Sequence, residues 1–314
     1  MGVGLVRRGG TGSISHSKLV TPYTLLDVYG ATYSIINNGH ITLKDFGTVS
    51  TPPITGSLTL FAKDRAGKTL VSVVGPSGVD FNIQPALYGS TTIFWTPIAT
   101  TSLPIFWGVS WLARNNLGVQ SRPAKTSTNQ MTSLNRHRYS TTAASLSSSG
   151  IQSFDSVAWR GSASGLGGFF FFSRFGMETI GTLANLRVII GLSALNGLLN
   201  VEPSSIVDTV ALVKDAADTT WQLVIRNALT STKQSTGVTV VVNQVLDIYI
   251  HVKPNDTNAT FELRAATGGL LFAQILSTGM VTSTTFLYIQ AQVQTTTTTL
   301  SALAISQMYL EMDL

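Results

Sequence analysis

The chain has 314 residues, which is enough to bury the core of one large β domain or of two smaller domains. Only 11% of its residues are charged and 44% are hydrophobic, which excludes an intrinsically disordered chain. It contains no cysteine, which excludes disulfides, zinc–thiolate sites and thiol nucleophiles.

The net charge of +5 is unevenly distributed along the chain. Residues 1–149 carry a net charge of +8, and residues 150–314 carry a net charge of −3. Such a basic half could pack on an acidic partner subunit, or it could bind nucleic acid. The basic residues are scattered through predicted strands and turns and are not clustered with aromatic residues, so we favour the protein partner and predict no nucleic-acid binding.

No segment fits a membrane span or a signal peptide. The apolar stretch 186–199 is interrupted by Arg187, Ser193 and Asn196, and it falls short of the ~20 residues that a span needs. Residues 1–10 lack the apolar region and the cleavage site of a signal peptide. We therefore predict no membrane insertion.

Residues 1–50 are interpreted as an N-terminal arm followed by a hairpin. Residues 1–20 have five glycines and little periodicity, and they carry Arg7, Arg8 and Lys18. We expect them to form an arm that anchors the chain to a neighbouring protein through these cations. Farther on, Asn38-Gly39 lies between apolar runs, which is a strong hairpin signal because both residues accept positive φ.

Residues 57–84 have the pattern of a three-stranded β-meander. Leu58, Leu60 and Ala62 alternate with Thr59, Phe61 and Lys63, and the turn DRAGK and a second strand follow. The turn GPSG leads to a third strand, which Pro85 ends because it has no backbone N–H. The meander and the aromatic-rich stretch after it form a predicted module over residues 51–114. Its aromatic residues suit a sugar-stacking platform or, as we favour, a core or subunit interface; they are Phe94, Trp95, Phe106, Trp107 and Trp111.

The remaining chain divides into a predicted polar linker, 115–150, and a predicted β-sandwich, 151–314. The linker is rich in Ser, Thr, Asn and Ala. The later part has short alternating runs, such as Leu246, Ile248 and Ile250, with turn signals between them and no helical periodicity. We therefore predict an all-β protein in which antiparallel hairpins and a meander precede a jelly-roll-like antiparallel sandwich.

The amino-acid sequences of several segments resemble those of one protein family. GSLTLFAKDRAGK, running into GPSGVDFNIQPAL, resembles bacteriophage tail fibre and other virion structural proteins. Five further segments are similar to the same family: Arg136-His137-Arg138 before a polar stretch, GLGGFFFFSRFG, LRVIIGL, DTVALVKDAADTTWQLVIR and the ending MYLEMDL. The resemblance covers residues 56–314.

The resemblance implies a structural protein of the phage particle. It points first to a tail fibre or tail-tip protein that contributes to host attachment, and alternatively to a head decoration, head fibre or baseplate connector protein. It implies synthesis in the host cytoplasm without a signal peptide, then incorporation into the virion. The implied partners are other virion proteins, reached through the N-terminal region, and a glycan or protein on the host surface.

Motifs for catalysis are incomplete. The P-loop-like Gly67-Lys68-Thr69 has Ala62 where the motif needs glycine, and Ala163 stands where a nucleophile elbow needs serine. The four histidines are far apart in sequence, and we expect His251 to lie on a solvated strand face. The sequence therefore predicts no catalytic residue, cofactor or metal site, and no enzyme. A glycan depolymerase with paired acids, such as Asp215 and Asp218, is the third alternative.

Two binding surfaces are predicted. The charge-poor runs Gln290–Gln294 and Thr295–Thr299 are typical of a permanent interface, so we expect a homo-oligomer, a trimer in particular. Host recognition is expected on loops of the C-terminal half, because loops tolerate change while strands are committed to the core. The candidate receptor-facing residues are Trp159, Asn200, Asp215, Asp218, Asn255 and Asn258.

Overall fold

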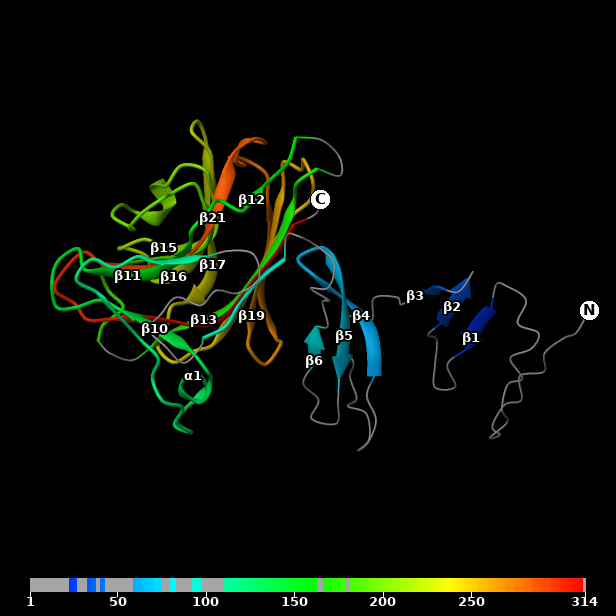
Figure 1. Ribbon diagram of the computed structural model, residues 1–314, viewed down its shortest axis with the longest axis horizontal. Coiled ribbons are helices and arrows are strands. Elements are labelled where there is room, and N and C mark those ends of the chain that lie inside the picture. Colours follow the sequence, from blue (N-terminus) through cyan, green and yellow to red (C-terminus); the bar gives the residue numbers. More distant parts are fainter. Residues whose placement is uncertain are drawn as a thin grey trace, which may run out of the picture. The chain divides into compact units, whose positions relative to one another are not determined.

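Nearly every regular element of the chain is a β-strand, which confirms the predicted all-β class (Figure 1). The computed structural model forms two units, which are described separately: residues 1–65 with 69–84, and residues 66–68 with 85–314. The structure describes residues 23–26, 33–37, 40–42, 59–74, 80–82, 92–97, 110–162, 166–178 and 181–312. The predicted anchoring residues Arg7, Arg8 and Lys18 lie outside these ranges.

The first unit contains the predicted hairpin. Strands β1 (Tyr23–Leu26), β2 (Tyr33–Asn37) and β3 (His40–Thr42) form an antiparallel sheet in that order. Asn37 is paired with His40, so the strands on either side of Asn38-Gly39 form the hairpin that the sequence predicts.

The predicted meander is also present. Strands β4 (Thr59–Arg65), β5 (Lys68–Val74) and β6 (Asp80–Asn82) form a sheet in chain order. The turn between β4 and β5 has positive φ at both central residues, 52° at Ala66 and 76° at Gly67. Two positive φ angles suit the twist of a two-residue hairpin loop. Ala66 therefore adopts the left-handed conformation although it is not a glycine.

The second unit is a sandwich of two antiparallel sheets (Figure 1). The first sheet has the order β20-β19-β18-β13-β22-β10-β9, with β7 also paired to β22. The second sheet has the order β17-β16-β15-β14-β21-β11-β8, with β12 also paired to β21. The elements of this unit are β7 (Thr92–Trp95), β8 (Trp111–Ala113), β9 (Val119–Ser121), α1 (Gln130–Ser133), β10 (His137–Ser140), β11 (Ser148–Ser153), β12 (Ala158–Trp159), β13 (Phe169–Glu178), β14 (Leu186–Ser193), η2 (Pro203–Ser205), β15 (Thr209–Lys214), β16 (Thr220–Arg226), β17 (Ser231–Thr239), β18 (Leu246–Val252), β19 (Ala259–Ala265), β20 (Leu270–Leu276), β21 (Phe286–Thr295) and β22 (Ala302–Met312).

The segment expected to be a linker is instead part of the sandwich. Within residues 115–150, β9 and β10 complete one edge of the first sheet, and β11 pairs with β21 in the second sheet. Strands β7 and β8, expected to belong to a separate aromatic module, also join the sandwich. The abundance of serine and threonine wrongly suggested an exposed linker, because β11 is buried along its whole length despite its polar composition.

No helix in the described residues is long and apolar enough to cross a membrane.

The core lies between the two sheets and includes phenylalanines from the apolar run at the start of β13. Phe169 and Phe171 point into the main core cluster, where Phe175 meets Trp221 edge-to-face at 5.2 Å between ring centroids. Phe170 lies on the opposite side of the strand and is also buried, as predicted for a run covered on both faces. Each such phenylalanine contributes roughly 1.5–3 kcal/mol of transfer free energy.

The outer face of the second sheet is covered by the loop between β14 and β15, and buried glutamines hold this loop in place. Gln292 is 0% exposed; its Nε2 donates to Gly197 O at 2.9 Å, and its Oε1 accepts from Leu199 N at 2.9 Å. Gln290 Nε2 donates to Leu195 O at 2.9 Å. These glutamines bind their own chain, so the glutamine run does not support the predicted subunit interface.

Candidate functional site

One end of the sandwich carries a partly exposed pair of aromatic rings, called here the aromatic pair. Strand β12 is short and pairs with the start of β21, which sets Trp159 opposite Phe286. Their rings stack with centroids 5.3 Å apart and an angle of 13° between the planes. Phe286 is 50% exposed and Trp159 is half-buried. An exposed aromatic surface on two hydrogen-bonded strands is a rigid apolar platform.

The loop Pro254–Asn258 is attached to the strand that carries Trp159. Asn255 N donates to Arg160 O at 2.9 Å, and Arg160 Nη1 donates to Asp256 O at 3.3 Å. Arg160 Nε is buried and has no hydrogen-bond partner. Backbone contacts therefore fix the loop beside the aromatic pair, and one arginine N–H is left over.

The polar side chains of this loop are partly arranged by one another. Asp256 Oδ1 accepts hydrogen bonds from the backbone N and from Nδ2 of Asn258, at 3.0 and 2.9 Å. Asn255 is exposed and has a φ of 55°, a value that asparagine tolerates better than most residues. The loop thus presents one oriented amide–carboxylate pair and one free amide.

Glycine explains how the loop and the strand approach so closely. Gly168 has a φ of 84°, and a Cβ on it would lie 2.6 Å from Pro254 N. Its own N–H donates to Trp159 O at 3.1 Å. Glycine is therefore required at position 168 by the close contact among β12, β13 and the loop. Residues 163–165 of the predicted Gly161–Gly165 loop lie outside the described residues.

Three of the six predicted receptor-facing residues lie around the aromatic pair: Trp159, Asn255 and Asn258. Arg160 and Phe286 belong to the same surface and were missed, because only the β12–β21 pairing shows that Phe286 meets Trp159. Asn200 is exposed in the loop between β14 and β15, where its carbonyl accepts from Arg187 Nη1 at 3.3 Å.

The prediction that Asp215 faces a receptor is wrong. Asp215 is only 7% exposed, and its carboxylate binds Lys233 Nζ at 2.7 Å and Ser204 N at 3.0 Å. Burial alone would raise the pKa of Asp215, but the hydrogen bonds from Lys233 and Ser204 outweigh it and lower the pKa.

Asp218 belongs to the same network. One carboxylate oxygen of Asp218 is 2.9 Å from Lys233 Nζ, and the side chain also accepts from Asp215 N at 2.9 Å. Lysine thus bridges both acids, an arrangement that stabilises the turn between β15 and β16. In the described part of the chain, no three His, Asp or Glu side chains gather as a metal site would require.

The similarities to known proteins are similarities of structure and not of sequence. No protein-family model and no curated protein sequence matches the chain. A protein of unknown function from Shewanella oneidensis MR-1 has a similar structure, with a TM-score of 0.53 at 12% identity over 71% of this chain and 86% of that one. Arcelin-5, a lectin-like defence protein from Phaseolus vulgaris, gives a TM-score of 0.44 at 9% identity, covering 70% of this chain and 98% of arcelin-5. The carbohydrate recognition domain of Emp47p gives 0.41 at 10% identity, covering 72% and 97%. At such low identity, the likeness to the Shewanella protein is one of fold alone.

Proposed function

We propose that this chain is a non-catalytic structural protein of a bacteriophage particle that binds a neutral saccharide on the host surface through the end with the aromatic pair. The observation that carries the binding role is the aromatic pair beside the loop Pro254–Asn258. The virion assignment rests on the sequence resemblance over residues 56–314.

The chemistry of this surface suits a sugar. Aromatic rings stack on the apolar face of a sugar ring, while a few placed polar groups fix its orientation. Phe286 supplies the exposed ring, and Asn255 and Asn258 supply amides for sugar hydroxyls. No carboxylate of this loop has the partner expected of a glycosidase pair, since Asp256 is hydrogen-bonded to Asn258.

The test is adsorption of the purified chain to host cells, together with binding to an array of neutral glycans. Trp159→Ala should abolish adsorption, because it removes half of the stacked platform. Phe94→Ala is the matched control, since Phe94 is a partly exposed aromatic residue of β7 on the other sheet. If the wild-type chain binds neither cells nor glycans but is found in the particle, a decoration or connector role replaces the attachment role.

The predicted homo-oligomer is better supported by β20 than by the glutamine run. Among the described strands, β20 pairs only with β19, so its other side is a free edge. Leu270 and Ile275 on this strand are 53% and 58% exposed, and no Lys, Arg, Asp or Glu occurs from Ala265 to Leu310. Free edges are normally protected by charge, so an uncharged apolar edge favours pairing with another strand. We propose that it pairs with β20 of a second copy.

Light scattering at micromolar concentration tests this interface. Leu270→Lys with Ile275→Lys should yield monomers, and the control is Leu229→Lys, because Leu229 is 92% exposed in a turn. Antiparallel pairing of two identical edges has twofold symmetry and predicts a dimer. A mass of three chains would instead favour the trimer expected from the sequence and a different interface. A monomeric wild-type chain would contradict both.

A further inference from the structure

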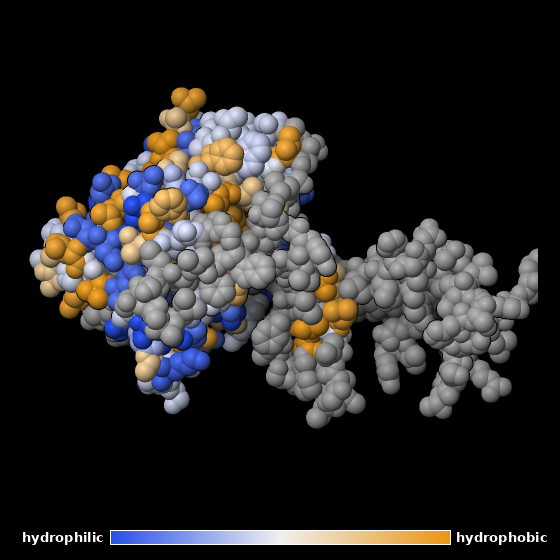
Figure 2. Space-filling model, viewed as in Figure 1, coloured by the Kyte–Doolittle hydropathy of each residue, from blue (hydrophilic) through white to orange (hydrophobic). Residues whose placement is uncertain are grey.

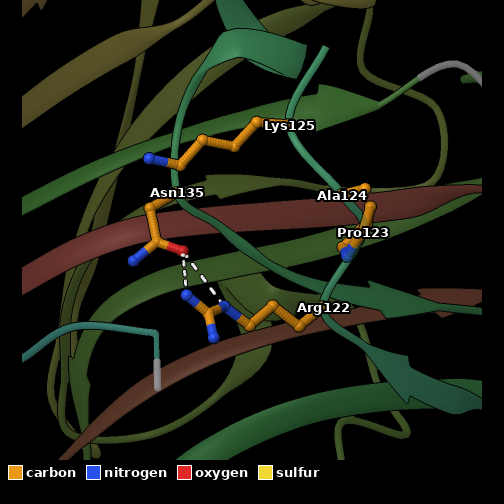
Figure 3. Close-up of a pocket in the computed structure, with 5 residues that line it drawn as sticks. All are labelled: Arg122, Pro123, Ala124, Lys125 and Asn135. Atoms are coloured by element: carbon orange, nitrogen blue, oxygen red, sulfur yellow. Dashed lines mark hydrogen bonds between the residues drawn. The ribbon is translucent and has the colours of Figure 1, made fainter. Parts of the chain in front are cut away.

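A pocket lies between the end of β9 and the start of β10, beside α1, and its chemistry differs from that of the aromatic pair (Figure 3). Its volume is about 270 Å³, it is open to solvent, and it is lined by Arg122, Pro123, Ala124, Lys125 and Asn135. We call it the basic pocket. Hydrophilic residues gather around α1 at the lower edge of the sandwich in Figure 2.

The basic pocket lies at the opposite end of the sandwich from the aromatic pair. Gly168, just before β13, bonds to Trp159, whereas Glu178 at the other end of β13 binds Arg136, which follows Asn135. A ten-residue strand such as β13 spans roughly 30 Å. The two sites are therefore independent.

The guanidinium of Arg122 is held in place without being neutralised. Its Nε and Nη2 donate to Asn135 Oδ1 at 3.1 and 2.9 Å, and Asn135 Nδ2 donates to Pro97 O at 3.0 Å. The neutral amide fixes one side of the fork, as the dashed lines in Figure 3 show. Lys125 is exposed and extends on the other side of Asn135 from Arg122, with both cationic groups near the Asn135 side chain (Figure 3).

Carboxylates are absent from this part of the sequence. Residues 81–154 contain five Lys or Arg and no Asp or Glu. The carboxylate of Glu178 reaches in from β13, but it binds Arg136 through two hydrogen bonds of 3.0 and 2.7 Å and Arg138 at 3.5 Å. Arg122 and Lys125 have no ion pair within the described residues. Burial and then the charge of Arg122 lower the pKa of nearby His137, which is consistent with a positive field here.

We propose that the basic pocket binds a small oxyanion, a carboxylate or a phosphate, on a small ligand such as a monosaccharide. A pre-oriented guanidinium and an exposed ammonium together match an anionic group, because the first gives directed hydrogen bonds and the second gives charge. The volume of about 270 Å³ is just below the range of drug-sized sites, which suits a ligand of about one sugar ring. A single pocket without exposed stacking rings does not fit a nucleic-acid strand.

The experiment is calorimetric titration of the full chain with glucuronate, glucose 6-phosphate, inorganic phosphate and glucose at low salt. We expect the anionic ligands to bind and glucose not to bind, with weakening as NaCl screens the charges. Arg122→Gln and Lys125→Gln should each weaken binding about tenfold, the usual size of a hydrogen bond to a charged group. Lys125→Gln is the variant that should leave folding intact, because Lys125 is exposed and makes no hydrogen bond or ion pair with the described residues.

The control variant is Lys253→Gln, which removes an equal charge from an exposed lysine at the other end of the sandwich. It should leave anion binding unchanged, as should Trp159→Ala, so failure of this proposal is distinguishable from failure of the saccharide proposal. Binding of glucuronate alone assigns the anion to an acidic sugar, and binding of both phosphates alone assigns it to a phosphorylated ligand. The proposal is overturned if glucose binds equally well, if no anion binds at about 10 mM, or if a short oligonucleotide binds far more tightly than either anion.

Discussion

Replacing Gln292 with leucine tests whether the buried glutamines hold the chain together internally. Leucine has a similar size but no hydrogen-bonding atoms, so Gln292→Leu keeps the volume and removes three hydrogen bonds. The groups left without a partner are Leu199 N, Gly197 O and Gln290 Oε1. Leu199 is fully buried, so its N–H cannot turn to water.

The magnitude follows from the burial of these three groups. An unpaired buried donor costs about 1–3 kcal/mol, which places the Leu199 N–H near 2 kcal/mol. The two acceptors add about 1 kcal/mol more, because Gly197 is partly exposed and Gln290 keeps its other hydrogen bonds. We therefore expect a loss of about 3 kcal/mol, or a urea midpoint lowered by about 1 M or more.

Urea unfolding followed by circular dichroism measures this loss at two protein concentrations. Gln234→Leu is the control, because Gln234 is exposed on β17 and its amide bonds only the neighbouring Ser235 carbonyl; it should change stability by less than about 0.5 kcal/mol. Equal stabilities of Gln292→Leu and wild type would refute the internal role. A loss that depended on protein concentration would return the glutamine run to a subunit interface.

Two further predictions concern the sites around the core. The lowered pKa of Asp215 means that its charged form stabilises the fold above its ordinary pKa of about 3.9; Asp215→Asn should therefore be less stable than wild type at pH 7, and urea midpoints should show the difference shrinking as the pH falls toward 3. Gly168→Ala should lower the melting temperature by several degrees, because it combines positive φ with a 2.6 Å contact. Gly269→Ala, where a Cβ meets nothing within 4 Å, should leave the melting temperature unchanged; equal effects would contradict the close-approach argument.

Local patterns in the sequence predicted the strands well because alternation and turn chemistry act within a few residues. In β18, Leu246, Ile248 and Ile250 point into the core as their spacing indicates. The same strand shows where the reasoning failed, since His251 was expected in solvent and is only 7% exposed.

The cause of that failure is a long-range contact. Ala66, which belongs to the same unit as the sandwich, places its carbonyl 3.1 Å from His251 Nδ1 and donates its N–H to Glu262 at 2.7 Å. The partners are separated by 185 and 196 residues, so no periodicity within a strand could reveal that this outer face is covered. The stacking of Trp159 on Phe286 was hidden for the same reason, whereas Asn255 and Asn258 were found because they share one loop.

Charge counted along the sequence also differs from charge available on the surface. The second half of the chain carries a net charge of −3, but most of its carboxylates are bound to cations of this same chain. These internal pairs are Glu178 with Arg136, Asp247 with Arg174, Glu202 with Arg187, Glu262 with Arg264, and Asp215 and Asp218 with Lys233. These carboxylates are therefore already paired, while Arg114, Arg122 and Lys125 have no ion pair within the described residues. An anion attracted by the net positive charge of the chain should therefore concentrate at the basic pocket, while the opposite end presents the aromatic pair and the amides of the loop Pro254–Asn258. The two ends of one rigid sandwich are thus suited to ligands of different charge.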